Sequence, residues 1–233
     1  MEDKSTRRNK LLNRAKKLEA ILMDSTLEGA YLPSSKGKSL DTQVPDSMDY
    51  EIHKALKQIT QDVGGDMDNF VRDRLGYPTK KSLYEALSAE QIDAVGMAIY
   101  NIEALNQAII IGDQTGIGKG RIASSMIRYA VHQGIKPIVL TEKANLFSDL
   151  YRDLEAIGSA HLRPFIVNAK ESKTDIKDEN GLVVYQAPSS MEQNHIFETA
   201  ELKNYDFVIG TYSQFNSPLK KSSKPDFLRK IAD

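Results

Sequence analysis

The stretch from Ile109 to Arg121 constrains the fold of this chain more than any other segment. It begins with three β-branched apolar residues, Ile109 to Ile111, which are typical of a short buried strand. Three glycines follow and allow tight turns, and Lys119 begins a helical pattern that extends to about residue 133. In such an arrangement the loop N–H groups and the positive end of the helix dipole converge beside the charged lysine. The stretch therefore predicts a phosphate-binding loop.

This loop departs from the usual P-loop pattern at two positions. Asp113 stands where the first glycine normally lies, and Gly120 replaces the Ser or Thr that normally binds Mg²⁺. The alternative interpretation is an ordinary junction of strand, turn and helix with incidental glycines. The combination of glycines, lysine and flanking patterns favours phosphate binding over that alternative.

Residues 112–121 resemble the nucleotide-binding motif of Strawberry notch-type helicases, a superfamily-2 branch that includes large phage and plasmid proteins. In that family a Gly-Arg pair follows the lysine, as Gly120 and Arg121 do here. The other blocks that resemble the family are residues 31–35, 39–45, 74–77, 87–95, 137–142, 146–154 and 210–215. The resemblance covers roughly residues 30 to 215, and the loop with its upstream glutamine is its most specific part.

The resemblance implies that this chain binds ATP and Mg²⁺, with Lys119 as the catalytic lysine that contacts the β- and γ-phosphates. The implied nucleotide-binding residues are Gln91, Asp113, Gln114, Thr115, Gly116, Ile117, Gly118, Lys119, Gly120 and Arg121. Arg121 has two equal interpretations, a phosphate contact or a pair with an acidic neighbour. No residue is assigned as a metal ligand, because Mg²⁺ could rest on phosphates, water and carboxylates from elsewhere.

Gln91 also has two interpretations. With Ser88 it fits a capping box, in which the serine and the third helical residue satisfy each other's backbone N–H groups. In superfamily-2 helicases, a glutamine at about this distance before the phosphate loop binds the adenine edge, and Gln91 lies 28 residues before Lys119. An amide suits adenine because it offers one donor and one acceptor.

The first part of the chain is predicted to be a helical N-terminal module, residues 1–86. Residues 4–22 are basic and amphipathic, which fits a solvated helix or, alternatively, an arm that contacts nucleic-acid phosphates. Residues 32–46 carry loop-forming residues and are predicted to be an extended loop. Helices are predicted at residues 48–63, 67–75 and 80–86.

From residue 87 onward, alternating strands and helices predict an α/β fold with a parallel sheet and flanking helices. The predicted helices are 89–101, 119–133, 145–157 and 190–201, and the predicted strands are 107–111, 137–141, 163–168, 181–186 and 206–211. By resemblance, residues 87–233 form a partial RecA-like P-loop NTPase lobe, the first lobe of a helicase.

Two strand ends are implied to contact nucleic acid, single- or double-stranded DNA, through its sugar-phosphate backbone. The implied contact residues are Thr141, Lys143, Thr211 and Tyr212. Ordinary helix capping is at least as good an interpretation for Thr141. On the next helix, Asp149, Arg152 and Asp153 are expected to form a solvated face rather than a catalytic cluster.

Composition excludes several classes of protein. The net charge of −1 provides no global attraction to nucleic acid, so DNA contacts must be local. There are no cysteines, and the four histidines have no metal-ligand spacing. No apolar run approaches the ~18 residues of a membrane span, and the N-terminus lacks a signal-peptide core. We expect a cytoplasmic protein, located in the host cytoplasm if a phage encodes it.

An acidic pair that follows a buried strand is expected in a motor ATPase, and none occurs after Thr211. We therefore expect the front part of an ATP-dependent helicase, without Walker B and without turnover alone, whose partner is the missing C-terminal helicase portion. The alternative is a catalytically inert fragment that serves as an interaction or virion-associated module. A P-loop phosphotransferase is a third possibility, weakened by the position of Gln91 and by the lack of an acceptor-binding signature.

Overall fold

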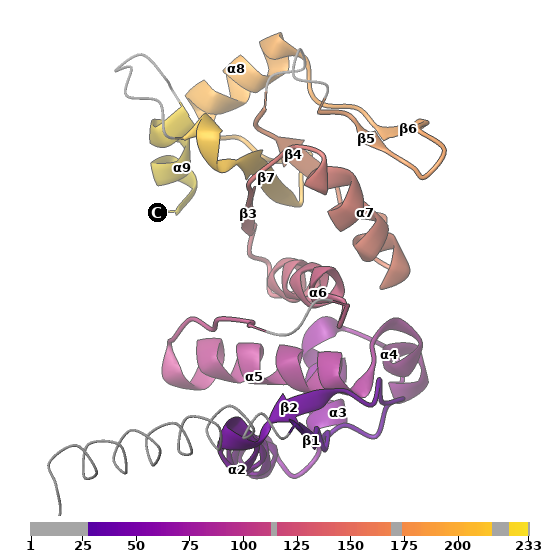
Figure 1. Ribbon diagram of the computed structural model, residues 1–233. Coiled ribbons are helices and arrows are strands. Elements are labelled where there is room, and N and C mark those ends of the chain that lie inside the picture. Colours follow the sequence, from indigo (N-terminus) through magenta and orange to yellow (C-terminus); the bar gives the residue numbers. More distant parts are fainter. Residues whose placement is uncertain (1–27, 113–115, 169–173, 216–223, 233) are drawn as a thin grey trace, which may run out of the picture.

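The computed structural model describes residues 28–112, 116–168, 174–215 and 224–232. Helices dominate the lower part of the molecule in Figure 1, and a small sheet with its own helices forms the upper part. The predicted basic helix within residues 4–22 lies outside the described residues. No helix of the described ranges combines the length and the apolar character needed to cross a membrane.

The lower part contains four consecutive helices that match the predicted positions closely. They are α2 (Asp46–Asp62), α3 (Met67–Leu75), α4 (Lys80–Ala86) and α5 (Ala89–Leu105). Side-chain caps explain where three of them begin, because Asp66, Thr79 and Ser88 each accept a hydrogen bond from a backbone N–H of the first turn. The predicted loop 32–46 is mostly irregular, but its end forms β2 (Gln43–Pro45), which pairs antiparallel with β1 (Glu28–Ala30).

Three buried carboxylates fasten the irregular segment 31–41 to the helices. Asp93 of α5 is fully buried. Asp68 of α3 and Glu90 of α5 are also buried, and each accepts a hydrogen bond from a backbone N–H of this segment. The donors to Asp93 are the hydroxyl of Tyr31 at 3.1 Å and the backbone N–H groups of Ser34 at 2.7 Å and Ser35 at 3.0 Å. Burial raises the pKa of Asp93 to about 6 despite these three hydrogen bonds.

One hydrophobic core joins these helices to α6 (Lys119–His132). Its fully buried members include Leu56, Val71, Leu83, Ile92, Ile99 and Ile122. Although α5 and α6 belong to the predicted 87–233 unit, their apolar faces pack with α2, α3 and α4. The division into 1–86 and 87–233 therefore stays a prediction.

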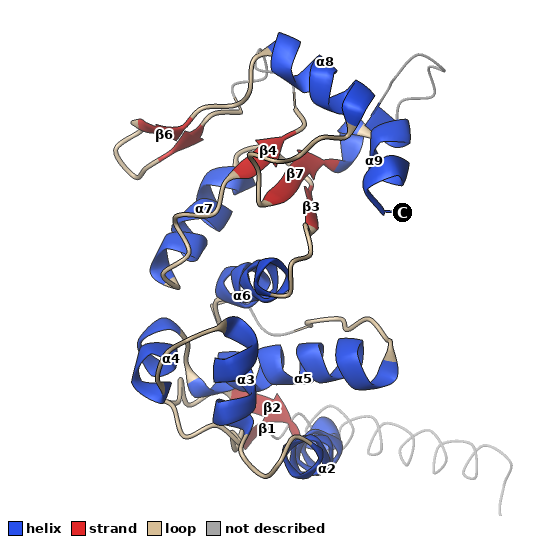
Figure 2. Ribbon diagram, turned by 180° about the vertical axis from the view of Figure 1, so that it is seen from behind, coloured by secondary structure: helices blue, strands red, loops and turns tan. Residues whose placement is uncertain are grey.

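The upper part is built on a three-stranded parallel sheet with the order β3-β7-β4. The strands are β3 (Ile138–Thr141), β4 (Pro164–Ile166) and β7 (Phe207–Thr211). The associated helices are α7 (Leu146–Ala156), α8 (Ser190–Thr199) and α9 (Lys224–Ala232), which lie around the sheet in Figure 2. This arrangement confirms the predicted α/β class and is consistent with a partial RecA-like P-loop fold.

The central strand, β7, is buried on both faces. Phe207 and Ile209 belong to a core that includes α7 and Ile127 of α6, whereas Val208 belongs to a second core with α8 and α9. Such two-sided burial is expected of a central parallel strand, because successive side chains point to opposite faces.

One strand prediction was wrong, and another predicted strand lies outside the parallel sheet. Residues 106–112 are irregular rather than a strand at 107–111, and Ile110 is 94% exposed. The chain leaves α5 through Asn106 in the left-handed conformation, and Ile111 then packs against the helical core instead of entering the sheet. The predicted strand 181–186 does contain β6 (Val183–Tyr185), but β6 pairs antiparallel with β5 (Ile176–Lys177) in a separate hairpin.

Candidate functional site

The glycine-rich loop ends at the N-terminus of α6. Gly118 is the N-cap residue of α6 and adopts a left-handed conformation with φ 81°, and Gly116 also has a positive φ of 100°. No side chain caps α6. In the first turn of α6 the Arg121 N–H donates to the Gly118 carbonyl oxygen at 2.9 Å. The positive end of the helix dipole lies at this terminus, beside the exposed Lys119. This end of α6 is suited to an anion. Asp113, Gln114 and Thr115 lie outside the described residues.

Gln91 is buried and connects α5 to this loop. Its Nε2 donates a hydrogen bond of 2.7 Å to the carbonyl oxygen of Ile117, and its Oε1 accepts one of 3.0 Å from the backbone N–H of Ser88. The backbone N–H of Gln91 donates to the Ser88 hydroxyl at 3.4 Å, so the predicted capping box is present. The contact with Ile117 could not be inferred from the capping pattern. The adenine contact of Gln91 remains a prediction.

Gly118 is required at its position for two independent reasons. A side chain would be strained at φ 81°, and a Cβ there would lie 2.5 Å from Nε2 of Gln91. The loop backbone therefore lies directly against the Gln91 amide.

Gly120, where a P-loop normally has a hydroxyl residue, lies against a carboxylate. A Cβ at Gly120 would lie 1.9 Å from Oδ2 and 2.9 Å from Cγ of Asp153, which belongs to α7. Burial raises the pKa of Asp153 above its usual value, and the charges of Arg152 and Arg121 oppose this increase. Asp153 is thus a partly buried acid beside the loop.

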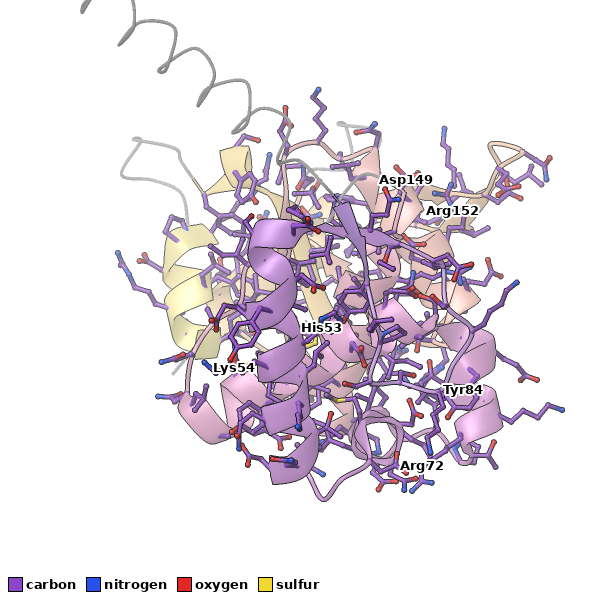
Figure 3. All side chains as sticks on the ribbon, turned by 60° about the horizontal axis from the view of Figure 1, so that its bottom comes forward. His53, Lys54, Arg72, Tyr84, Asp149 and Arg152 are labelled. Carbon is purple, nitrogen blue, oxygen red and sulfur yellow. The ribbon has the colours of Figure 1, made fainter. Side chains whose placement is uncertain are left out.

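The predicted solvated face of α7 is therefore only partly correct. Asp149 and Arg152 form an exposed ion pair of 3.2 Å and lie close together in Figure 3. Asp153 does not belong to that solvated face, because its carboxylate packs against Gly120. Arg121 donates a hydrogen bond of 3.4 Å from Nη1 to the carbonyl oxygen of Ala86. Its nearby charge also lowers the pKa of Asp153, and its phosphate contact stays a prediction.

A cavity of about 390 Å³ lies between α5, the loop region, β2 and the start of α2. Its wall includes Ala94 and Met97 of α5 and Ile110, Gly112 and Ile117 of the loop region. An apolar cavity with a few polar groups at its edge is the usual form of a small-molecule site.

The four predicted nucleic-acid residues lie near the carboxyl ends of two neighbouring strands. Thr141 ends β3 directly opposite Thr211, which ends β7. The Thr141 hydroxyl donates a hydrogen bond of 3.0 Å to the Lys143 carbonyl oxygen, and Lys143 forms an exposed ion pair with Glu142. Tyr212 is 54% exposed. Backbone contacts to DNA by these residues stay a prediction.

Thr211 itself is buried and held by Asn168, a residue that the sequence analysis did not identify. Asn168 Oδ1 accepts a hydrogen bond of 3.0 Å from the Thr211 backbone N–H, and Asn168 Nδ2 donates one of 3.1 Å to the Thr211 hydroxyl. The available signal was the position of a polar residue directly after the apolar residues 165–167. Polar residues at this point of parallel strands gather at the ligand-binding edge of the sheet.

The parallel sheet and the glycine-rich loop before α6 together define a P-loop NTPase. The family model of the P-loop containing NTP hydrolase pore-1 matches residues 55–232, which is most of the chain. The chain belongs to this family. No curated protein matches it.

The described residues also fit the nucleotide and Mg²⁺ that P-loop NTPases generally bind. Lys119 and the N-terminus of α6 suit the phosphates, and Asp153 places a carboxylate oxygen beside Gly120. Within the described ranges, no group of three or more His, Cys, Asp and Glu side chains is arranged to hold a metal.

Proposed function

We propose that this chain is the ATP-binding N-terminal part of a Strawberry notch-like DNA helicase or translocase encoded by a phage or mobile element. The support for the helicase class is the sequence resemblance over roughly residues 30 to 215. The observation that carries ATP binding is the hydrogen bond from Gln91 to Ile117, which fixes the loop against α5 beside the N-terminus of α6. Membership of a P-loop NTP hydrolase family supports the same function.

In this proposal each part of the site has a separate role. The N–H groups around Gly116, Gly118 and Gly120 bind the phosphates, and Lys119 neutralises charge on the β- and γ-phosphates. The adenine ring enters the apolar cavity beside the loop, whose lining includes Glu90, the residue before Gln91, and Ile117, which accepts the Gln91 hydrogen bond. Mg²⁺ supplies charge neutralisation on the phosphates when it is bound.

The DNA contacts in this proposal come from the carboxyl edge of the sheet. Thr141, Lys143 and Tyr212 are exposed or partly exposed there and can reach phosphates, whereas the buried Thr211 hydroxyl positions the start of the following turn. Hydroxyl and ammonium groups bind phosphates without distinguishing bases, as a translocating protein requires.

Titration of the purified 233-residue chain with a fluorescent ATP analogue tests the proposal. We expect measurable binding that Lys119→Ala abolishes, because the phosphates lose their positive partner. Lys81→Ala is a matched control, since Lys81 is an exposed lysine on α4 that forms only a weak pair with Glu85 at 3.8 Å. Equal affinity of wild type and Lys119→Ala contradicts the assignment of the loop.

A further inference from the structure

The residue after the loop lysine has no side chain, and a carboxylate from another helix takes its space. A Cβ at Gly120 would lie 1.9 Å from Oδ2, 2.9 Å from Cγ and 3.6 Å from Oδ1 of Asp153. Real Cβ atoms do not approach other atoms so closely, so Ser or Thr at position 120 cannot coexist with this placement of Asp153. The side chain that normally occupies this position supplies an oxygen to Mg²⁺.

The packing between α6 and α7 fixes where Asp153 lies. Leu150 and Leu154 of α7 are buried in the same core as Ile127 of α6. The hydroxyl of Ser124, one helical turn after Gly120, donates a hydrogen bond of 3.4 Å to the Leu150 carbonyl oxygen. Because residues three or four positions apart share a helix face, these contacts hold Asp153 on the face of α7 that meets Gly120.

The Asp153 carboxylate has no structural partner that would explain its burial. Among the described residues, no group forms a hydrogen bond or an ion pair with it, whereas Asp149 of the same helix pairs with Arg152. Arg121 and Arg152 affect its pKa only through their charges. Partial burial disfavours the charged form of this carboxylate, and a cation beside it would offset that cost.

We propose that Asp153 supplies the protein oxygen for the Mg²⁺ of the bound nucleotide, in place of the missing P-loop hydroxyl at position 120. This inference rests on the proposed ATP binding. Carboxylate oxygens are preferred Mg²⁺ ligands, and Mg²⁺ in nucleotide sites is typically bound by one or two carboxylates together with phosphates and water. The carboxylate compensates for the absent hydroxyl and in addition brings a full negative charge to the cation.

The test is the gain in nucleotide affinity that Mg²⁺ produces, measured by titration of a fluorescent ATP analogue with Mg²⁺ and with EDTA. In wild type we expect Mg²⁺ to strengthen binding. Asp153→Asn should lose on the order of tenfold in affinity with Mg²⁺ and little with EDTA, because only the cation loses a ligand. Glu155→Gln, an exposed acid on the same helix, is the matched control and should keep the full Mg²⁺ gain.

A reciprocal exchange separates cation binding from a packing role. Gly120→Ser alone should weaken binding, because the new side chain meets Asp153. The double variant Gly120→Ser with Asp153→Ala removes that clash and provides the usual hydroxyl, so it should recover much of the Mg²⁺ gain. Electron paramagnetic resonance of Mn²⁺ bound with the nucleotide provides a second readout, and we expect its spectrum to change in Asp153→Asn but not in Glu155→Gln.

The outcomes distinguish the two proposals. If Lys119→Ala binds the analogue as well as wild type does, the proposed ATP binding fails and this inference fails with it. If wild type binds ATP and Asp153→Asn keeps the full Mg²⁺ gain, or loses affinity equally with Mg²⁺ and with EDTA, the inference about Asp153 alone is overturned.

Discussion

The amide of Gln91 donates a 2.7 Å hydrogen bond to the carbonyl oxygen of Ile117, in the glycine-rich loop. The same amide accepts a hydrogen bond from Ser88 at the start of α5. The Gln91 side chain thus caps the N-terminus of α5 and also holds the loop that precedes α6. Its Oε1 and Nε2 each form a hydrogen bond, so substitutions at Gln91 can remove one of these hydrogen bonds or both.

We expect Gln91→Ala to lower the free energy of unfolding by about 1–3 kcal/mol, because it removes a cap acceptor and leaves buried polar groups unpaired. It should also lower affinity for ATP more than for inosine triphosphate, which lacks the adenine amino group. Gln91→Glu keeps an oxygen for the Ser88 N–H but cannot donate to Ile117, so it isolates the loop contact. Urea denaturation and nucleotide titration measure these effects, and an equal loss for both nucleotides would leave Gln91 with the structural role only.

Gly118→Ala should abolish nucleotide binding, whereas Gly134→Ala should not. Both glycines border α6 and have similar positive φ angles, 81° and 76°. A Cβ at Gly118 lies 2.5 Å from Gln91, but nothing lies within 4 Å of a Cβ at Gly134. Left-handed strain should cost each variant about 1–2 kcal/mol of stability, and Gly118→Ala should lose more. Comparable nucleotide affinity in the two variants contradicts the importance of the Gln91 contact.

Stability should depend on pH through Asp93, whose pKa burial raises to about 6 from the ordinary value of 3.8. A carboxyl group whose pKa is raised by folding is most favourable when protonated, so its contribution is complete below about pH 4 and declines as pH rises to about 6. Asp93→Asn does not titrate. Its destabilisation relative to wild type should therefore be larger at pH 4 than at pH 7, by about 2 kcal/mol.

Denaturant unfolding of both proteins across this pH range provides the measurement. Tyr31, Ser34 and Ser35 donate to Asp93 and favour its ionised form, which opposes the effect of burial. A pH-independent difference between wild type and Asp93→Asn would show that these donors cancel the effect of burial.

The 233-residue chain should release phosphate from ATP no faster than its Lys119→Ala variant. Hydrolysis requires a carboxylate that positions the attacking water, which contributes several powers of ten in rate. Within the described part of the parallel sheet, β3, β4 and β7 are followed by Glu142, Val167 and Tyr212, and no strand is followed by an Asp-Glu pair. Phosphate release that requires Lys119 would reveal a catalytic carboxylate elsewhere in the chain.

Helices were predictable from sequence because their signals are local. The bounds of α3 and α4 agree with those predicted, and the Ser88–Gln91 capping box lies where the pattern placed it. The prediction of a strand at 107–111 was wrong because strands depend on non-local contacts. Ile109 to Ile111 have the intrinsic preferences of a strand, but strand formation depends on a pairing partner, which no local pattern specifies.

The contacts that define the site were also beyond the sequence pattern. The glycine at 120 was recognised as unusual, yet its reason lies on a different helix, at Asp153. Only the packing of α6 against α7 brings these two positions together. Conversely, the loop glycines and Lys119 were identifiable, because positive φ angles and a helix N-terminus leave a clear local pattern.

The helix that follows the loop contributes side chains to two cores. Ile122 and Tyr129 of α6 belong to the core of the lower helices, whereas Ile127 belongs to the core beneath the sheet. Melting α6 therefore exposes apolar surface in both parts of the molecule at once. Neither part retains its full core without this helix, so the helical part and the sheet should unfold in one cooperative transition rather than as two independent domains.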